Sequence, residues 1–138
     1  MSDDHYTDAS HPIEGMWRLV TTQAWDAQGQ PMPPPYGARP MGEVYIHRGR
    51  MMAALCDADP NLPPGAPREY NSYGGFYEFD GTELRTRVDI CSRPDWLGSL
   101  QVRQAQLDGD TLILRPPLRD FNGILLQREL RWERVWRP

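Results

Sequence analysis

The chain has 138 residues, a length that fits one domain built around a single hydrophobic core. Its formal net charge of −4 at pH 7 argues against a nucleic-acid-binding surface, and no stretch approaches the roughly 18 consecutive apolar residues of a membrane span. The first residues are acidic and lack the apolar segment of a secretory signal, so the sequence predicts a cytoplasmic protein without nucleic-acid or membrane partners.

Residues 1–13 are polar and aperiodic and predict a flexible tail, which leaves residues 14–138 as the folded domain. In this domain apolar and polar residues alternate with the period of two that is typical of β-strands. The first half contains three such runs, at residues 16–25, 43–47 and 50–56. The proline-rich segments 28–40 and 57–69 predict long loops, because proline lacks the backbone donor that an interior strand needs. Long loops in a small domain usually serve as lids or entrance loops.

The second half of the chain contains five further alternating runs, at residues 72–79, 83–91, 99–107, 111–115 and 124–136. Asp80-Gly81 and Asp108-Gly109 are strong hairpin signals, and Arg48-Gly49 joins two of the earlier strands by a tight turn. Eight short antiparallel strands in sequence can close on themselves, and closure removes exposed strand edges. We therefore predict an all-β fold, an eight-stranded antiparallel up-and-down barrel, with an open sandwich as the alternative.

Three stretches of the sequence carry a resemblance to a known family. They are GMWRL at residues 15–19, PDWLGSLQVR at 94–103 with LDGDTL at 107–112, and LRWERV at 130–135. In this order and spacing they resemble motifs of the bacterial and fungal lipocalin-like domain proteins, which are small calycin-like barrels. The resemblance implies that Trp17 lies at the closed end of the barrel with Arg134 stacked over it, a structural use of both residues. It also implies an acidic residue at the position of Asp89, which would be available as an acid or base.

Alternation along each expected strand separates residues that face the lumen from residues that face solvent. Counting back by twos from Leu107 places Arg103 and Gln101 on the inner face of the sixth strand. The same procedure gives a largely apolar lumen with a few polar groups, and Trp96 is expected near it. The predicted ligand-binding residues are Gln23, Met51, Trp96, Gln101, Arg128 and Trp132.

Arg103 and Arg128 are two charged side chains that this count places inside the barrel, where an unpaired charge is costly. No carboxylate on the same faces is in an obvious position to pair with both. Three explanations stay open. One or both arginines reach the barrel mouth, the assumed strand register is off by one residue, or at least one arginine meets an anionic or carbonyl oxygen of a ligand.

The residue types predict neither a metal site nor a cofactor. The three histidines, His5, His11 and His47, are scattered, whereas metal ligands must converge. Cys56 and Cys91 have no metal-ligand spacing and are expected as reduced thiols, although a bridge between them stays open.

Two main functions fit these patterns. The first is binding of a small, largely apolar or aromatic, oxygen-bearing molecule in the lumen, which requires no catalytic group. The second is a cofactor-free enzyme acting on such a molecule in a biosynthetic or catabolic pathway, as a cyclase, isomerase, dehydratase or other lyase. Its catalytic residues would be Arg103, Tyr77 and Asp89. Fold alone does not decide between these functions; a protein-interaction module is a third reading, and homodimerisation stays open.

Overall fold

The computed structural model describes residues 12–138, which form a sheet of strands and one short 3-10 helix. Eight of the strands in this part of the chain are long: β1 (Gly15–Trp25), β3 (Pro40–His47), β4 (Arg50–Asp57), β5 (Tyr70–Phe79), β6 (Glu83–Cys91), β7 (Leu100–Asp108), β8 (Thr111–Arg115) and β10 (Ile124–Trp136). The smaller elements are strands β2 (Pro31–Met32) and β9 (Arg119–Phe121) and the 3-10 helix η2 (Pro94–Trp96).

The eight long strands close into an antiparallel barrel. Each pairs with the next long strand along the chain, and β1 pairs with both β3 and β10, which joins the two ends of the sheet. The predicted eight-stranded up-and-down barrel is therefore confirmed. The two short strands were not predicted: β2 pairs with the end of β1, and β9 forms a hairpin with the start of β10. Pro31 is tolerated in β2 because this strand lies at an edge, where a missing backbone donor removes no interior ladder bond.

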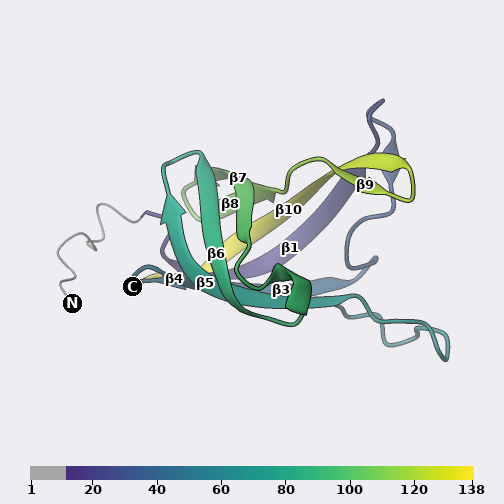
Figure 1. Cartoon of the computed structure of the whole chain (residues 1–138), viewed down its shortest axis with the longest axis horizontal. Coiled ribbons are helices and arrows are strands. Elements are labelled where there is room, and N and C mark those ends of the chain that lie inside the picture. The colour runs from purple at the N-terminus through teal and green to yellow at the C-terminus, as the bar shows by residue number, and fades with distance from the viewer. Residues whose placement is uncertain (1–11) are drawn as a thin grey trace.

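The two ends of the barrel differ in how the strands are connected (Figure 1). At one end, on the left of the view, short turns join β3 to β4, β5 to β6 and β7 to β8, and the chain ends there. The turn between β3 and β4 places Arg48 and Gly49 at positive φ, as a tight hairpin of the primed type requires. At the other end lie the long segments 26–39 and 58–69, helix η2 and the β9 hairpin. We call these the closed end and the open end.

A tryptophan and an arginine fill the closed end, as the family resemblance implies. Trp17 is fully buried, and the guanidinium carbon of Arg134 lies 4.4 Å from the centre of its ring. The indole Nε1 of Trp17 donates to the carbonyl oxygen of Ile13 at 3.0 Å. Ile13 is itself fully buried, so the packed domain includes a residue that the sequence assigns to the tail. The rest of the predicted tail, apart from Pro12, lies outside the described residues.

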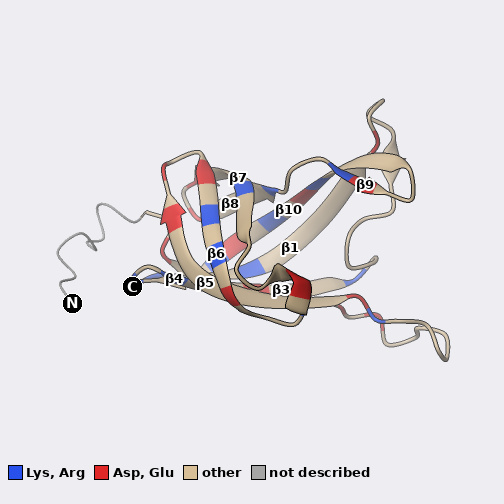
Figure 2. Cartoon of the chain, viewed as in Figure 1, with Lys and Arg blue, Asp and Glu red and all other residues tan. Residues whose placement is uncertain are grey.

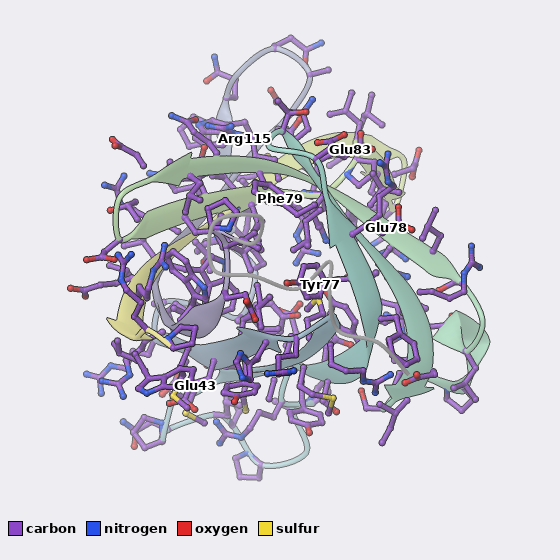
Figure 3. The ribbon with its side chains drawn as sticks, turned by 90° about the vertical axis from the view of Figure 1, so that its left-hand side faces the viewer. Glu43, Tyr77, Glu78, Phe79, Glu83 and Arg115 are labelled. Carbon is purple, nitrogen blue, oxygen red and sulfur yellow. The ribbon has the colours of Figure 1, made fainter. Side chains whose placement is uncertain are left out.

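Side chains alternate between the interior and the surface along the strands, as Figure 3 shows for β5, where Tyr77 and Phe79 point into the barrel and Glu78 points away from it. Three register shifts interrupt this alternation. The pairing of β1 with β10 shifts between Met16 and Trp17 and between Leu19 and Thr21, and the pairing of β5 with β6 shifts between Gly74 and Gly75. Each is a β-bulge that adds one residue to one strand, so the residues beyond it change faces.

Charged residues of both signs are interspersed along the strands and loops (Figure 2). Several form ion pairs there, including Arg18 with Glu43, Arg85 with Glu83 and Arg115 with Glu129. Cys56 and Cys91 are not bonded to each other and are both partly buried. In the described residues no helix is long and apolar enough to cross a membrane.

Candidate functional site

A cavity of about 390 Å³ opens at the open end of the barrel. Its deeper walls are apolar side chains of four strands, β3, β4, β8 and β10: Val44, Ala53, Leu55, Leu114, Leu130 and Trp132. Its mouth is made by the loops and by the strand ends next to them, and it is much more polar. The mouth residues are Pro35, Tyr36, Glu69, Asn71, Arg93, Trp96, Pro116, Pro117 and residues 119–122. Apolar walls with a few polar groups are typical of sites that bind small molecules.

The segment that joins β1 to β3 lies over this mouth and is fixed by a polar network. The carboxylate of Glu69 accepts a hydrogen bond from the backbone N–H of Tyr36 at 2.7 Å, and the amide of Asn71 donates to the Tyr36 hydroxyl at 2.9 Å. The hydroxyl of Thr22 donates to the carbonyl oxygen of Pro35 at 2.7 Å. Burial raises the pKa of the Tyr36 phenol. Tyr36 is therefore a fixed part of the cavity wall.

Arg128 lines the cavity and is paired with a carboxylate that the sequence did not suggest. Its Nη2 lies 3.3 Å from a carboxylate oxygen of Glu69, and its guanidinium lies over the ring of Phe121 at 4.9 Å. Glu69 comes from the end of the proline-rich segment, next to β5, and not from an inner strand face. The search for a partner by strand alternation therefore missed it.

Arg103 also lines the cavity, but its partners are neutral. Its two terminal nitrogens donate to the Val102 carbonyl and to the side-chain oxygen of Gln101, both at 3.0 Å. Among residues 12–138, no carboxylate lies within ion-pair distance of Arg103. Arg103 faces the interior, as the alternation predicts. The sequence offers no obvious carboxylate partner for Arg103 or Arg128, and of the two only Arg103 lacks one in the structure.

Gln101 does not line the cavity, but its side chain is hydrogen-bonded to Arg103 and holds the guanidinium in position. Its amide nitrogen donates to the Ser99 hydroxyl at 3.0 Å, while its amide oxygen accepts from Arg103. The Ser99 hydroxyl in turn donates to the carbonyl oxygen of Trp96 at 2.6 Å. This chain of hydrogen bonds connects the guanidinium of Arg103 to helix η2.

The two tryptophans predicted near the lumen both line the cavity. Trp96 lies at the mouth, where its ring meets that of Tyr73 edge to face at 5.8 Å. Trp132 lies deeper and is only 2% exposed. Its indole Nε1 is buried, and within the described residues it has no hydrogen-bond partner. A buried donor without a partner is costly, so this N–H has a hydrogen bond to gain.

Two predicted binding residues lie elsewhere. Gln23 was assigned to the inner face by counting from Trp17, but the bulge between Leu19 and Thr21 reverses the faces, and Gln23 is exposed. Met51 is fully buried, but in the packed core closer to the closed end, where its sulfur accepts a hydrogen bond from Thr86 at 2.7 Å. Neither side chain lines the cavity.

The three predicted catalytic residues do not come together. Arg103 lines the cavity, whereas Tyr77 is buried in the core toward the closed end, as seen in Figure 3. Asp89 is exposed on the outside of β6, in the bulge, and its partner is Arg50 instead of the neighbouring Arg87. Hydrogen bonds from Arg50 hold the pKa of the Asp89 carboxyl below its usual value. Asp89 is thus a paired surface carboxylate.

Residues of the mouth were largely missed by the sequence analysis. Tyr36, Glu69 and Asn71 lie in or beside the proline-rich segments, and Phe121 lies in the β9 hairpin. Alternation gives no information about side-chain direction in such segments. The usable signal was the length of the loops, since long loops in small domains often form entrances.

A family model of the lipocalin-like domain matches residues 65–135, just over half of the chain. The matched region runs from the end of the second proline-rich segment through β5 to β8 and most of β10, and so contains Arg103, Arg128 and Trp132. No curated protein and no solved structure matches the chain. A barrel of this kind with an apolar cavity is compatible with binding a small hydrophobic molecule. The chain belongs to the lipocalin-like domain family.

Proposed function

We propose that this protein binds a small, largely apolar or aromatic molecule that carries at least one oxygen atom, and that it holds this molecule in the cavity at the open end. The cavity volume of about 390 Å³ falls near the lower end of the roughly 300–1,000 Å³ that small-molecule sites occupy. The apolar walls supply the driving force for binding, since burying apolar surface is favourable by about 25 cal/mol per Å².

The buried N–H of Trp132 is the observation that carries this proposal. An indole N–H without a partner loses its hydrogen bonds to water on folding and gains none from the described residues in return. A ligand with a carbonyl, hydroxyl or carboxylate oxygen would supply the missing acceptor when the side chains that cover this N–H move on binding. The site therefore favours an oxygen-bearing ligand over a pure hydrocarbon.

Binding is also favoured over catalysis by where the candidate catalytic residues lie. An acid or base must reach the reacting group, directly or through one water molecule. Tyr77 and Asp89 do not line the cavity, and the carboxylate of Asp89 is engaged by Arg50 on the outer surface. Of the predicted catalytic set, only Arg103 could touch a bound molecule.

Tryptophan fluorescence tests the proposal, because Trp96 and Trp132 line the cavity. Titration with a panel of phenols, apolar acids and aryl ketones should give saturable quenching or a spectral shift. The panel includes acetylnaphthalene and isopropenylnaphthalene, which have the same shape but differ in that a methylene group replaces the carbonyl oxygen. We expect tighter binding of the ketone. A flat response across the whole panel would contradict a ligand-binding cavity.

The variant Trp132→Phe tests the role of the indole N–H. It keeps an aromatic ring in the wall, removes the donor, and leaves Trp96 as a reporter. We expect the affinity for acetylnaphthalene to fall by about 0.5–1.5 kcal/mol, the usual net value of a hydrogen bond, while the affinity for isopropenylnaphthalene stays the same. Equal losses for both probes would mean that Trp132 contributes only its shape.

A further inference from the structure

The charge of the cavity mouth is opposite to the charge of the whole chain. The chain carries a formal net charge of −4, yet four arginines and only two carboxylates line the cavity: Arg93, Arg103, Arg119 and Arg128 against Glu69 and Asp120. An excess of positive charge at the entrance of a cavity with low-dielectric walls attracts anions to it. The mouth therefore favours a negatively charged ligand over a neutral or cationic one.

The four arginines are not equivalent. Arg128 is paired with Glu69, Arg93 lies 3.7 Å from the carboxylate of Asp95, and Arg119 is exposed at the rim over the ring of Phe121. Arg103 is partly buried and has only neutral acceptors, both on its own strand. Its positive charge is thus uncompensated among the described residues, which makes it the arginine with most to gain from an anionic partner.

The strand register sets the height of Arg103 in the barrel. Leu114 on β8 faces Ala105 on β7 on one side and Leu130 on β10 on the other, so these three residues form one rung. Arg103 is two residues from Ala105, and Arg128 is two residues from Leu130, in both cases toward the open end. Arg103 and Arg128 therefore lie at the same height on the two strands that flank β8. Both are one inward-facing position closer to the open end than the apolar residues Ala105, Leu114 and Leu130.

We propose that the ligand is an apolar or aromatic carboxylic acid whose carboxylate binds Arg103 while its apolar body packs against Leu114, Leu130 and Trp132. This inference rests on the proposed function and specifies the chemical class of the ligand. A carboxylate matches the planar fork of a guanidinium with two parallel hydrogen bonds, and it would replace the neutral oxygen of Gln101 as an acceptor. Gln101 is then a positioning residue, which holds the guanidinium in place when the cavity is empty.

Three probes of one shape test the inference: naphthoate, naphthamide and acetylnaphthalene, all substituted at the same ring position. Their affinities are measured by tryptophan fluorescence for the wild-type chain, Arg103→Met and Arg87→Met. Arg103→Met keeps most of the side-chain volume and removes the charge. Arg87→Met removes a charge from the exposed outer face of β6 and serves as the matched control.

We expect the wild-type protein to bind naphthoate at least about tenfold more tightly than naphthamide, as hydrogen bonds to charged groups contribute about 1.5–3 kcal/mol. Arg103→Met should lose this preference while its affinity for naphthamide stays within about twofold, and Arg87→Met should keep the preference. Equal wild-type affinities for naphthoate and naphthamide, or a preference that survives in Arg103→Met, would overturn the inference and leave the proposed function standing. Binding of acetylnaphthalene without binding of naphthoate would do the same. Failure of all three probes, together with the rest of the panel, would instead overturn the proposed function.

Discussion

The closed end and the cavity each contain a tryptophan and an inward-facing arginine, but the two pairs differ in the partners of their polar groups. At the closed end, Trp17 Nε1 donates to a backbone carbonyl, and Arg134 donates to the carbonyl oxygens of Glu14, Pro12 and Gly109 at 3.0–3.1 Å. The Nε of Arg134 lies 3.2 Å from the carboxylate of Asp110 as part of an ion pair, but it is buried and makes no hydrogen bond with the described residues. In the cavity wall, Trp132 Nε1 has no partner among the described residues, and Arg103, nearer the open end, has only neutral ones.

This difference separates residues that serve stability from residues that are available for binding. The same two residue types occur in both places, so residue type alone does not assign the role. Polar groups with several partners inside a protein fix one arrangement, whereas those without partners reduce stability unless a ligand supplies one. The closed end is thus a structural plug, and the cavity is the part of the molecule with unused hydrogen-bonding capacity.

Replacing Trp17 tests the structural half of this comparison and should give the largest effect. We expect Trp17→Ala to lower the free energy of unfolding by roughly 3–5 kcal/mol, as for other large aromatics removed from a core. Trp136→Ala is the control, since Trp136 stacks on Tyr45 but is 42% exposed, and should change stability much less. Chemical denaturation measures both. A Trp17→Ala protein as stable as the wild type would show that the plug does not hold the barrel together.

The two arginines should respond in opposite directions to the same substitution. Arg134→Met removes three hydrogen bonds from a charged group to backbone carbonyl oxygens and should cost about 1–3 kcal/mol of stability. Arg103→Met removes a charge that has no carboxylate partner among the described residues, so the melting temperature of the ligand-free protein should stay the same or rise. Thermal unfolding of both variants without ligand measures the contrast. The comparison fails if Arg103→Met is the more destabilising of the two.

The sequence predicted the closed end better than the open end, for a physical reason. Short turns such as Arg48-Gly49 and alternating strands leave a local signal, and the position of Trp17 in its motif came with the family resemblance. The same alternation placed Arg103, Arg128 and Trp132 at the cavity. The alternation gave the wrong face for Gln23. A one-residue bulge leaves no trace in a period-two pattern, yet it moves the side chains beyond it to the opposite face of the sheet.

The mouth depends on contacts between segments far apart in the chain, which no local pattern encodes. Glu69 illustrates this: its carboxylate holds the backbone of Tyr36, 33 residues earlier, and Arg128, 59 residues later. A carboxylate partner for Arg128 was sought on the inner strand faces, whereas the actual one comes from the end of a loop. Homodimerisation and a cytoplasmic location stay predictions.

The smallest expected effect is a pH dependence that originates at the mouth. Burial, together with the charge of Glu69, raises the pKa of the Tyr36 phenol above its ordinary value of 10.0, although the hydrogen bond from Asn71 acts in the opposite direction. The folded protein therefore holds the phenol proton more tightly than the unfolded chain does. This contribution to stability is fully present below about pH 10 and is lost as the pH rises through the folded-state value. Because the sequence contains no lysine, few groups other than tyrosines titrate in this range.

We expect the free energy of unfolding of the wild-type protein to fall between about pH 9.5 and pH 11, where unfolded tyrosine begins to ionise, and to fall less steeply in Tyr36→Phe. Tyr36→Phe also loses the hydrogen bond from Asn71, which lowers stability at every pH and leaves the slope as the informative quantity. Tyr70→Phe is the matched control: Tyr70 is 52% exposed, so its replacement should leave the wild-type slope unchanged. Urea denaturation at a series of pH values gives all three slopes. If Tyr36→Phe and Tyr70→Phe share the wild-type slope, the mouth segment opens before the barrel unfolds, and Tyr36 is not part of a fixed cavity wall.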